Sequence, residues 1–225
     1  IDKVFSWLKN RDQKKPFLLC AQYKVPHIHR LPPINRMKGY DDIEFPVPKT
    51  FFDNFSTRSS FVSETWMALK GMKGHVLNIG PTIEEINKNP KIRPPFLNEM
   101  NLKQRKAWHS AYDPRNLRYR KLIEEKKLQG KAKSLYIYQR FIKDYVRCID
   151  GLDDQIGRIL DYLDQNKLSK NTLVIYSSDQ GFFTGEHGWA EKRWMYEESF
   201  KSPLIMRWPG TISPGSKIVK LVRPS

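Results

Sequence analysis

The longest regular hydrophobic pattern in the chain lies between residues 134 and 168. Apolar side chains recur there at three- and four-residue spacing, beginning at Leu135 and continuing to Leu163. This spacing puts them on one face of an α-helix. We therefore predict one long helix that packs this face against a core. Gly151 lies within it and indicates either a bend or a close packing contact.

Short apolar runs are typical of buried strands at residues 17–23, 172–176 and 203–207, and a further strand is expected at 218–222. A short helix is predicted over residues 2–10. Strands that alternate with helices indicate an α/β fold with a mainly parallel central sheet flanked by helices.

Two long stretches of the chain show no clear periodicity of hydrophobic residues. Residues 25–55 contain five prolines, which exclude long regular structure and favour an ordered loop over the surface. Residues 56–133 are predicted to be irregular, with short helical pieces. Their aromatic residues argue against simple disorder.

The composition is compatible with a single domain, because 225 residues with 39% hydrophobic content can bury a sizeable core. No apolar run of about 18 residues is present, so no membrane span is expected. The chain begins at Ile1 inside a predicted helix and ends just after an apolar segment. We expect residues 1–225 to form one incomplete domain, and no signal peptide is visible in them.

The chain is strongly basic, with a net charge of +16, and residues 101–147 contain 14 Lys and Arg against 4 Asp and Glu. Such an excess attracts polyanions at long range. An ordinary solvated helix face explains the same charges, and both interpretations stay open. Nucleic acid is not expected as a partner, because no nucleic-acid-binding motif is present.

The two cysteines, Cys20 and Cys148, are too few for a disulfide framework. Cys20 lies in a predicted strand and Cys148 on the apolar side of the long helix. Both are predicted to be buried thiols.

Polar side chains that could carry chemistry follow the strand at 172–176. Asp179 and Gln180 offer oxygen ligands of the kind that Ca²⁺ and Mg²⁺ prefer. Lys192 and Arg193 follow and could bind an anion, although Arg193 has acidic neighbours with which it could pair instead. In open α/β sheets ligands bind at the carboxyl ends of strands. This segment therefore predicts a metal-assisted site for a charged ester.

Four sequences in the chain resemble one family in order and spacing: KKPFLLCAQYKVPH (14–27), SSDQGFFTGEHGW (177–189), EKRWMYEES (191–199) and PLIMRWPG (203–210). They are similar to type I sulfatases, the formylglycine- and calcium-dependent enzymes of the alkaline phosphatase-like superfamily. The resemblance implies a partial alkaline phosphatase-like domain. It also implies a sulfuric ester hydrolase that acts on sulfated glycans or on sugars derived from glycosaminoglycans.

The resemblance also implies roles for single residues. Asp179 and Gln180 would bind Ca²⁺, with Mg²⁺ less favoured. His27 and Lys192 would be catalytic: the histidine would protonate the leaving alcohol and the lysine would contact the sulfate. Further substrate contacts are expected from a second set of residues, which comprises Lys24, His187 and Arg193.

The nucleophile of that family is a formylglycine made from the Cys or Ser of a Cys/Ser-x-Pro-x-Arg motif. Neither Cys20 nor Cys148 begins such a motif. We expect the nucleophile region upstream of this chain and a C-terminal subdomain downstream, so residues 1–225 alone should be inactive. The implied partners are a sulfated carbohydrate and the formylglycine-generating maturation enzyme. The implied compartment is the periplasm, the extracellular space or the lysosome.

Two other functions remain open. A metal-dependent phosphoesterase or phosphonate hydrolase of the same superfamily would share the Asp-Gln-Gly strand end. A non-catalytic protein that binds polyanions through residues 101–147 would explain the basic charge.

Overall fold

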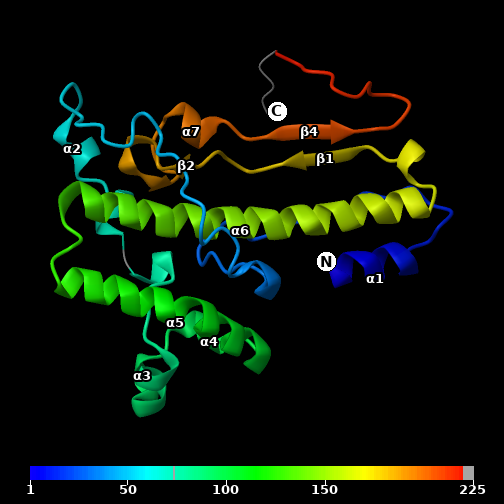
Figure 1. Ribbon diagram of the computed structural model, residues 1–225. Helices are drawn as coiled ribbons and strands as arrows, with labels where there is room; N and C mark the ends of the chain where they lie inside the picture. The colour runs from blue at the N-terminus through cyan, green and yellow to red at the C-terminus, as the bar shows by residue number, and fades with distance from the viewer. Residues whose placement is uncertain (73, 220–225) are drawn as a thin grey trace.

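The computed structural model describes residues 1–72 and 74–219. Its two long helices are α5 (Leu102–Glu124) and α6 (Gly130–Gln165). Figure 1 shows α6 running across the middle of the molecule, with α5 on one side and the strands β1 and β4 on the other. Among the helices of the described residues, none has the length and apolarity needed to cross a bilayer.

The remaining helices are short. They are α1 (Asp2–Asn10), α2 (Ser60–Ser63), α3 (Ile83–Lys88), α4 (Pro95–Asn98) and α7 (Glu197–Phe200), and several 3₁₀ turns lie in the loops between elements. The predicted helix over residues 2–10 is confirmed. The proline-rich segment 25–55 is a loop, as predicted, with one 3₁₀ turn at Ile34–Arg36.

The predicted long helix is confirmed as α6, which begins four residues earlier and ends three residues earlier than expected. Gly151 marks close packing. A Cβ at this position would lie 2.4 Å from Cγ of Pro33, so the proline ring of the loop rests directly on the helix backbone.

The strands of the described residues form two antiparallel pairs. β1 (Val174–Ser177) pairs with β4 (Leu204–Arg207), and β2 (Phe183–Thr184) pairs with β3 (Ala190–Glu191). The mixture of helices and strands agrees with the predicted α/β class. The expectation of mainly parallel pairing was wrong for these residues. After β1 the chain passes through β2, β3 and α7 and then runs back along β1, so β4 pairs with β1 antiparallel.

Residues 17–23 were predicted to form a buried strand and do not. They have no ladder partner among the described residues, and Leu18 is 85% exposed. Cys20 is therefore exposed, which corrects the prediction of a buried thiol, while Cys148 is buried as predicted. The strand expected at 218–222 is absent at residues 218–219, and its remaining residues lie outside the described part of the chain.

The helix α5 was missed within the region predicted to be irregular. It is largely polar and contains Pro114, which lacks the N–H of a helix interior. A local signal was present, because Asn101 and Gln104 form a capping box, each side chain accepting from the other's backbone N–H at 2.9 Å.

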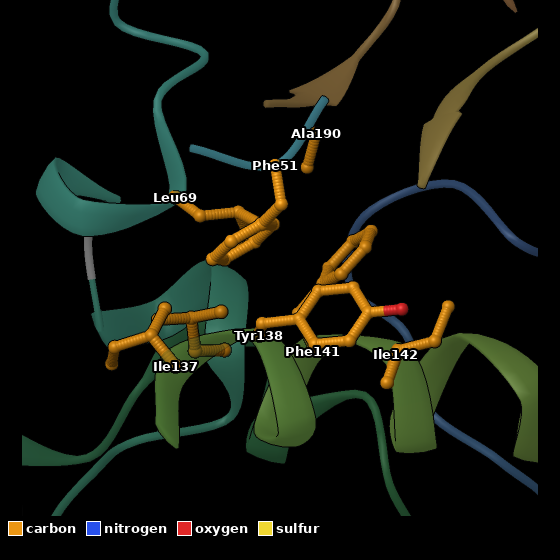
Figure 2. Close-up of a cluster of buried hydrophobic side chains, with 8 residues drawn as sticks. Phe51, Leu69, Ile137, Tyr138, Phe141, Ile142 and Ala190 are labelled. Carbon is orange, nitrogen blue, oxygen red and sulfur yellow. The ribbon is translucent and has the colours of Figure 1, made fainter. Parts of the chain in front are cut away.

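The core is built on the apolar face of α6. Figure 2 shows Ile137, Tyr138 and Phe141 of this helix packed toward Phe51, Leu69 and Ala190, which come from a loop, a 3₁₀ turn and β3, respectively. Ala190 is fully buried. This packing fixes β3, which leads directly into the segment that carries the predicted anion-binding lysine.

Candidate functional site

Residues from two distant parts of the chain line one cavity of about 1930 Å³. Its walls are the loop 13–27, the apolar face of the second half of α6, and β1 with the turn that follows it. Five of the seven predicted site residues line it: Lys24, His27, Asp179, Gln180 and Lys192. The other two, His187 and Arg193, lie elsewhere.

Asp179 and Gln180 occupy the turn directly after β1. Asp179 is exposed, and its Oδ1 accepts from Oγ of Ser178 at 3.3 Å. The next residue, Gly181, donates its backbone N–H to the carbonyl of Ser199 at 2.9 Å. A Cβ on Gly181 would lie 2.2 Å from the carbonyl oxygen of Glu198. Only glycine allows this turn to lie so close to α7.

The donors at this turn suit a hard cation, since a carboxylate and an amide carbonyl are oxygen ligands. Ca²⁺ takes six to eight such ligands. Within residues 1–72 and 74–219, no group of three or more His, Cys, Asp or Glu side chains could hold a metal ion. The described residues fit such a site in chemistry, but they supply only part of it.

Lys192 is 8% exposed and reaches the cavity wall from a buried position. Its Nζ lies 3.5 Å from Oε2 of Glu191 and 5.6 Å from the ring centroid of Phe182. The other carboxylate oxygen of Glu191, Oε1, accepts from Nη2 of Arg30 at 3.2 Å. Two cations thus share one buried carboxylate.

Arg30 is the least exposed of the three, at 1%. Its guanidinium lies over Phe141 at 4.8 Å and over Phe182 at 5.4 Å from the ring centroids. Burial lowers the pKa of Arg30, while the charge of Glu191 acts in the opposite direction. The sequence reasoning missed Arg30 and Glu191, because their pairing joins residues 161 positions apart.

Lys24 and His27 are exposed at the rim of the cavity, at two ends of one turn. The backbone N–H of His27 donates to the carbonyl of Lys24 at 2.9 Å. Nδ1 of His27 lies 3.0 Å from the carbonyl oxygen of Ile28. If Nδ1 donates this hydrogen bond, Nε2 is the ring nitrogen left for a ligand.

His187 is 9% exposed and lies in an aromatic cluster with Phe183, Trp189 and Tyr196. Its Nδ1 lies 2.7 Å from Oδ2 of Asp53. Through these contacts His187 packs inside its own loop, and it does not line the cavity.

Arg193 is exposed and points to the outer surface. Its guanidinium lies 5.8 Å from the ring centroid of Trp66, which is 63% exposed. It does not pair with Glu191, which is occupied by Arg30 and Lys192. Cys148, the buried cysteine, has its pKa raised to about 12 by burial, so its thiol stays protonated.

Comparison with known proteins gives a consistent result. The family model described as Sulfatase matches residues 1–223. N-acetylglucosamine-6-O-sulfatase of Bacteroides thetaiotaomicron is 34% identical over 221 residues, which cover 96% of this chain. Iduronate 2-sulfatase of Mus musculus is 35% identical over 78 residues, covering 34% of this chain and 14% of its own length.

A solved structure of a protein in complex with its substrate D-glucosamine-2-N,6-O-disulfate superposes with a TM-score of 0.87 at 36% identity. The superposition covers 96% of this chain and 43% of that one. The chain also spans only 38% of the length of the bacterial relative.

Proposed function

The chain belongs to the sulfatase family, and we propose that the protein of which it forms a part hydrolyses sulfate esters of sugars. The superposition with a solved structure bound to a sulfated glucosamine extends over nearly the whole chain and supports this fold assignment. The alkaline phosphatase-like α/β fold also accounts for the helix–strand–turn order around β1.

The observation that carries the proposal is the meeting of five side chains at one cavity. Lys24 and Lys192 are cations that suit a sulfate group, and Asp179 with Gln180 suits a metal ion. His27 is an imidazole, a side chain that can act as a general acid toward a leaving alcohol.

We propose calcium as the metal of this site, with Asp179 and Gln180 as two of its ligands and Mg²⁺ as the less favoured ion. When bound, such an ion stabilises negative charge on the ester oxygens. The remaining ligands, and a formylglycine nucleophile produced by the maturation enzyme, would come from parts of the protein outside these 225 residues. Neither cysteine here stands in the required motif.

The size of the cavity agrees with an incomplete domain. Ligand pockets are commonly about 300–1,000 Å³, and this one is about 1930 Å³. One wall is apolar and comes from α6, including Ile149, Leu152 and Ile156. We propose that further polypeptide of the same domain covers this wall, and that residues 1–225 alone are inactive. Export to the periplasm, the extracellular space or the lysosome is proposed from the family.

We propose a sulfated glucosamine as the first substrate class to test, since the bacterial relative is named for sulfate at the 6-O position of N-acetylglucosamine. Full-length protein, matured with the formylglycine-generating enzyme, should release sulfate from N-acetylglucosamine 6-sulfate. The variant K192A should lose this activity, and E64Q, which changes an exposed acid outside the cavity, should keep it.

Two results would contradict the proposal. Faster release of phosphate than of sulfate from a matched pair of aryl esters would indicate a phosphoesterase. Retention on heparin without release of sulfate from any sulfated sugar or aryl sulfate would indicate a protein that only binds polyanions.

A further inference from the structure

We propose that Glu191 is a positioning residue, which holds the ammonium group of Lys192 toward the cavity and is itself held by Arg30. The inference rests on the proposed function, because it deepens the role of Lys192 at the same site. Three charged side chains lie buried next to the cavity. Arg30, Glu191 and Lys192 are 1%, 5% and 8% exposed, respectively.

The four-carbon stem of a lysine side chain is flexible, so its ammonium group takes no single position unless a partner fixes it. The partner here is Glu191, whose Oε2 lies 3.5 Å from Nζ of Lys192. Glu191 also has a positive φ of 89°, a conformation that residues other than glycine adopt rarely. Such strain persists only where the surrounding structure enforces it, and it is concentrated at functional sites.

Arg30 is the fixed end of this arrangement. Its guanidinium lies over two aromatic rings and pairs with Oε1 of Glu191 at 3.2 Å. Its backbone carbonyl accepts from Nδ2 of Asn78 at 2.8 Å, and its Nη1 donates to the carbonyl of Val76 at 3.4 Å. Both oxygens of Glu191 are therefore committed, one to an immobile cation and one to the lysine that lines the cavity.

The three side chains carry one net positive charge. A buried charge without a partner is costly, so the excess cation favours an anion in the cavity. Other charged or titratable groups on the cavity wall are Arg11, Lys14, Lys15, Tyr23, Lys24, His27, Tyr145, Tyr176, Asp179, Glu197, Glu198 and Lys201. Lys192 is distinguished from the four other lysines of the wall by its burial, because all four are exposed.

The test compares E191Q, E191D and the surface control E64Q in the full-length matured protein. E191Q keeps the shape and removes the charge. It should lower kcat by about 100-fold, the effect of misplacing a group by about 1 Å, with a smaller change in KM. E191D, which retains a carboxylate, should recover part of the loss. E64Q should match the wild type.

A second measurement does not depend on activity. The extent of Lys192 acetylation by acetic anhydride is followed against pH by mass spectrometry. Lys192 should become reactive at lower pH in E191Q than in the wild type, because the ammonium group loses its negative partner. If E191Q does not fold, E191G replaces it, since glycine suits the positive φ of this position.

Equal acetylation profiles in wild type and variant, or an unchanged kcat, would overturn the role of Glu191. A wild-type protein that releases no sulfate would instead refute the proposed function, and the acetylation profiles would still decide whether Glu191 holds Lys192.

Discussion

Replacing Gly181 by alanine tests how the Asp-Gln-Gly turn is held in place. A Cβ at this position would lie 2.2 Å from the carbonyl oxygen of Glu198 and 3.0 Å from that of Lys201. Both are backbone atoms, so no side-chain rotation relieves the clash. The turn must move away from α7, and Asp179 and Gln180 must move with it.

The loss of stability expected for G181A has two contributions. Overpacking of a well-fitted site costs about 1–3 kcal/mol. The hydrogen bond from the Gly181 N–H to the carbonyl of Ser199, 2.9 Å long, contributes about 1 kcal/mol more if it breaks. We expect G181A to destabilise the protein by about 2–4 kcal/mol and to weaken calcium binding.

The assay is thermal unfolding of the full-length protein, with and without calcium. G157A is the matched control: Gly157 lies in α6, and a Cβ there would meet nothing within 4 Å. Alanine has the higher helix propensity, so G157A should stabilise by about 0.5–1 kcal/mol. If G181A unfolds at the wild-type temperature and binds calcium as tightly, the close approach of the turn to α7 does not constrain the site.

Three further predictions follow from other contacts. G151A should lower stability by about 1–3 kcal/mol, because its Cβ would lie 2.4 Å from Cγ of Pro33; unchanged thermal unfolding would contradict this packing. The Arg58 side chain is the largest cause, and the backbone N–H of Phe55 the second, that holds the pKa of Asp53 well below its usual range. The charged form therefore stabilises the fold fully above about pH 4, and this contribution declines as the pH falls toward the lowered pKa. D53N should therefore be less stable than the wild type at pH 7, and the difference should become smaller, without vanishing, at pH 3; urea unfolding at both pH values measures it, and a difference that does not shrink would contradict the assignment. D179A should lower calcium affinity at least about tenfold by calorimetry, and a chelator should abolish sulfate release reversibly in the wild type; calcium-independent activity would exclude the proposed metal role.

Much of the local structure was predictable because it depends on neighbouring residues. The period of apolar residues from Leu135 to Leu163 specifies a helix with one buried face, and α6 is that helix. The short apolar runs that became β1 and β4 were found for the same reason. The helix α5 was missed because its polar sequence with Pro114 carries no such period, and its formation depends on packing against α6, as in the hydrogen bond from Tyr112 to Asp144.

The sequence by itself determined the long helix, the two strands and the family, because periodicity and motifs are properties of consecutive residues. Only the tertiary structure decided which side chains meet. In the folded chain, Lys24 and His27 line the same cavity as Asp179 and Lys192. Arg193 lies on the outer surface, and Glu191 pairs with Arg30. Contacts between residues far apart in the chain depend on how whole elements pack, and no local pattern encodes them.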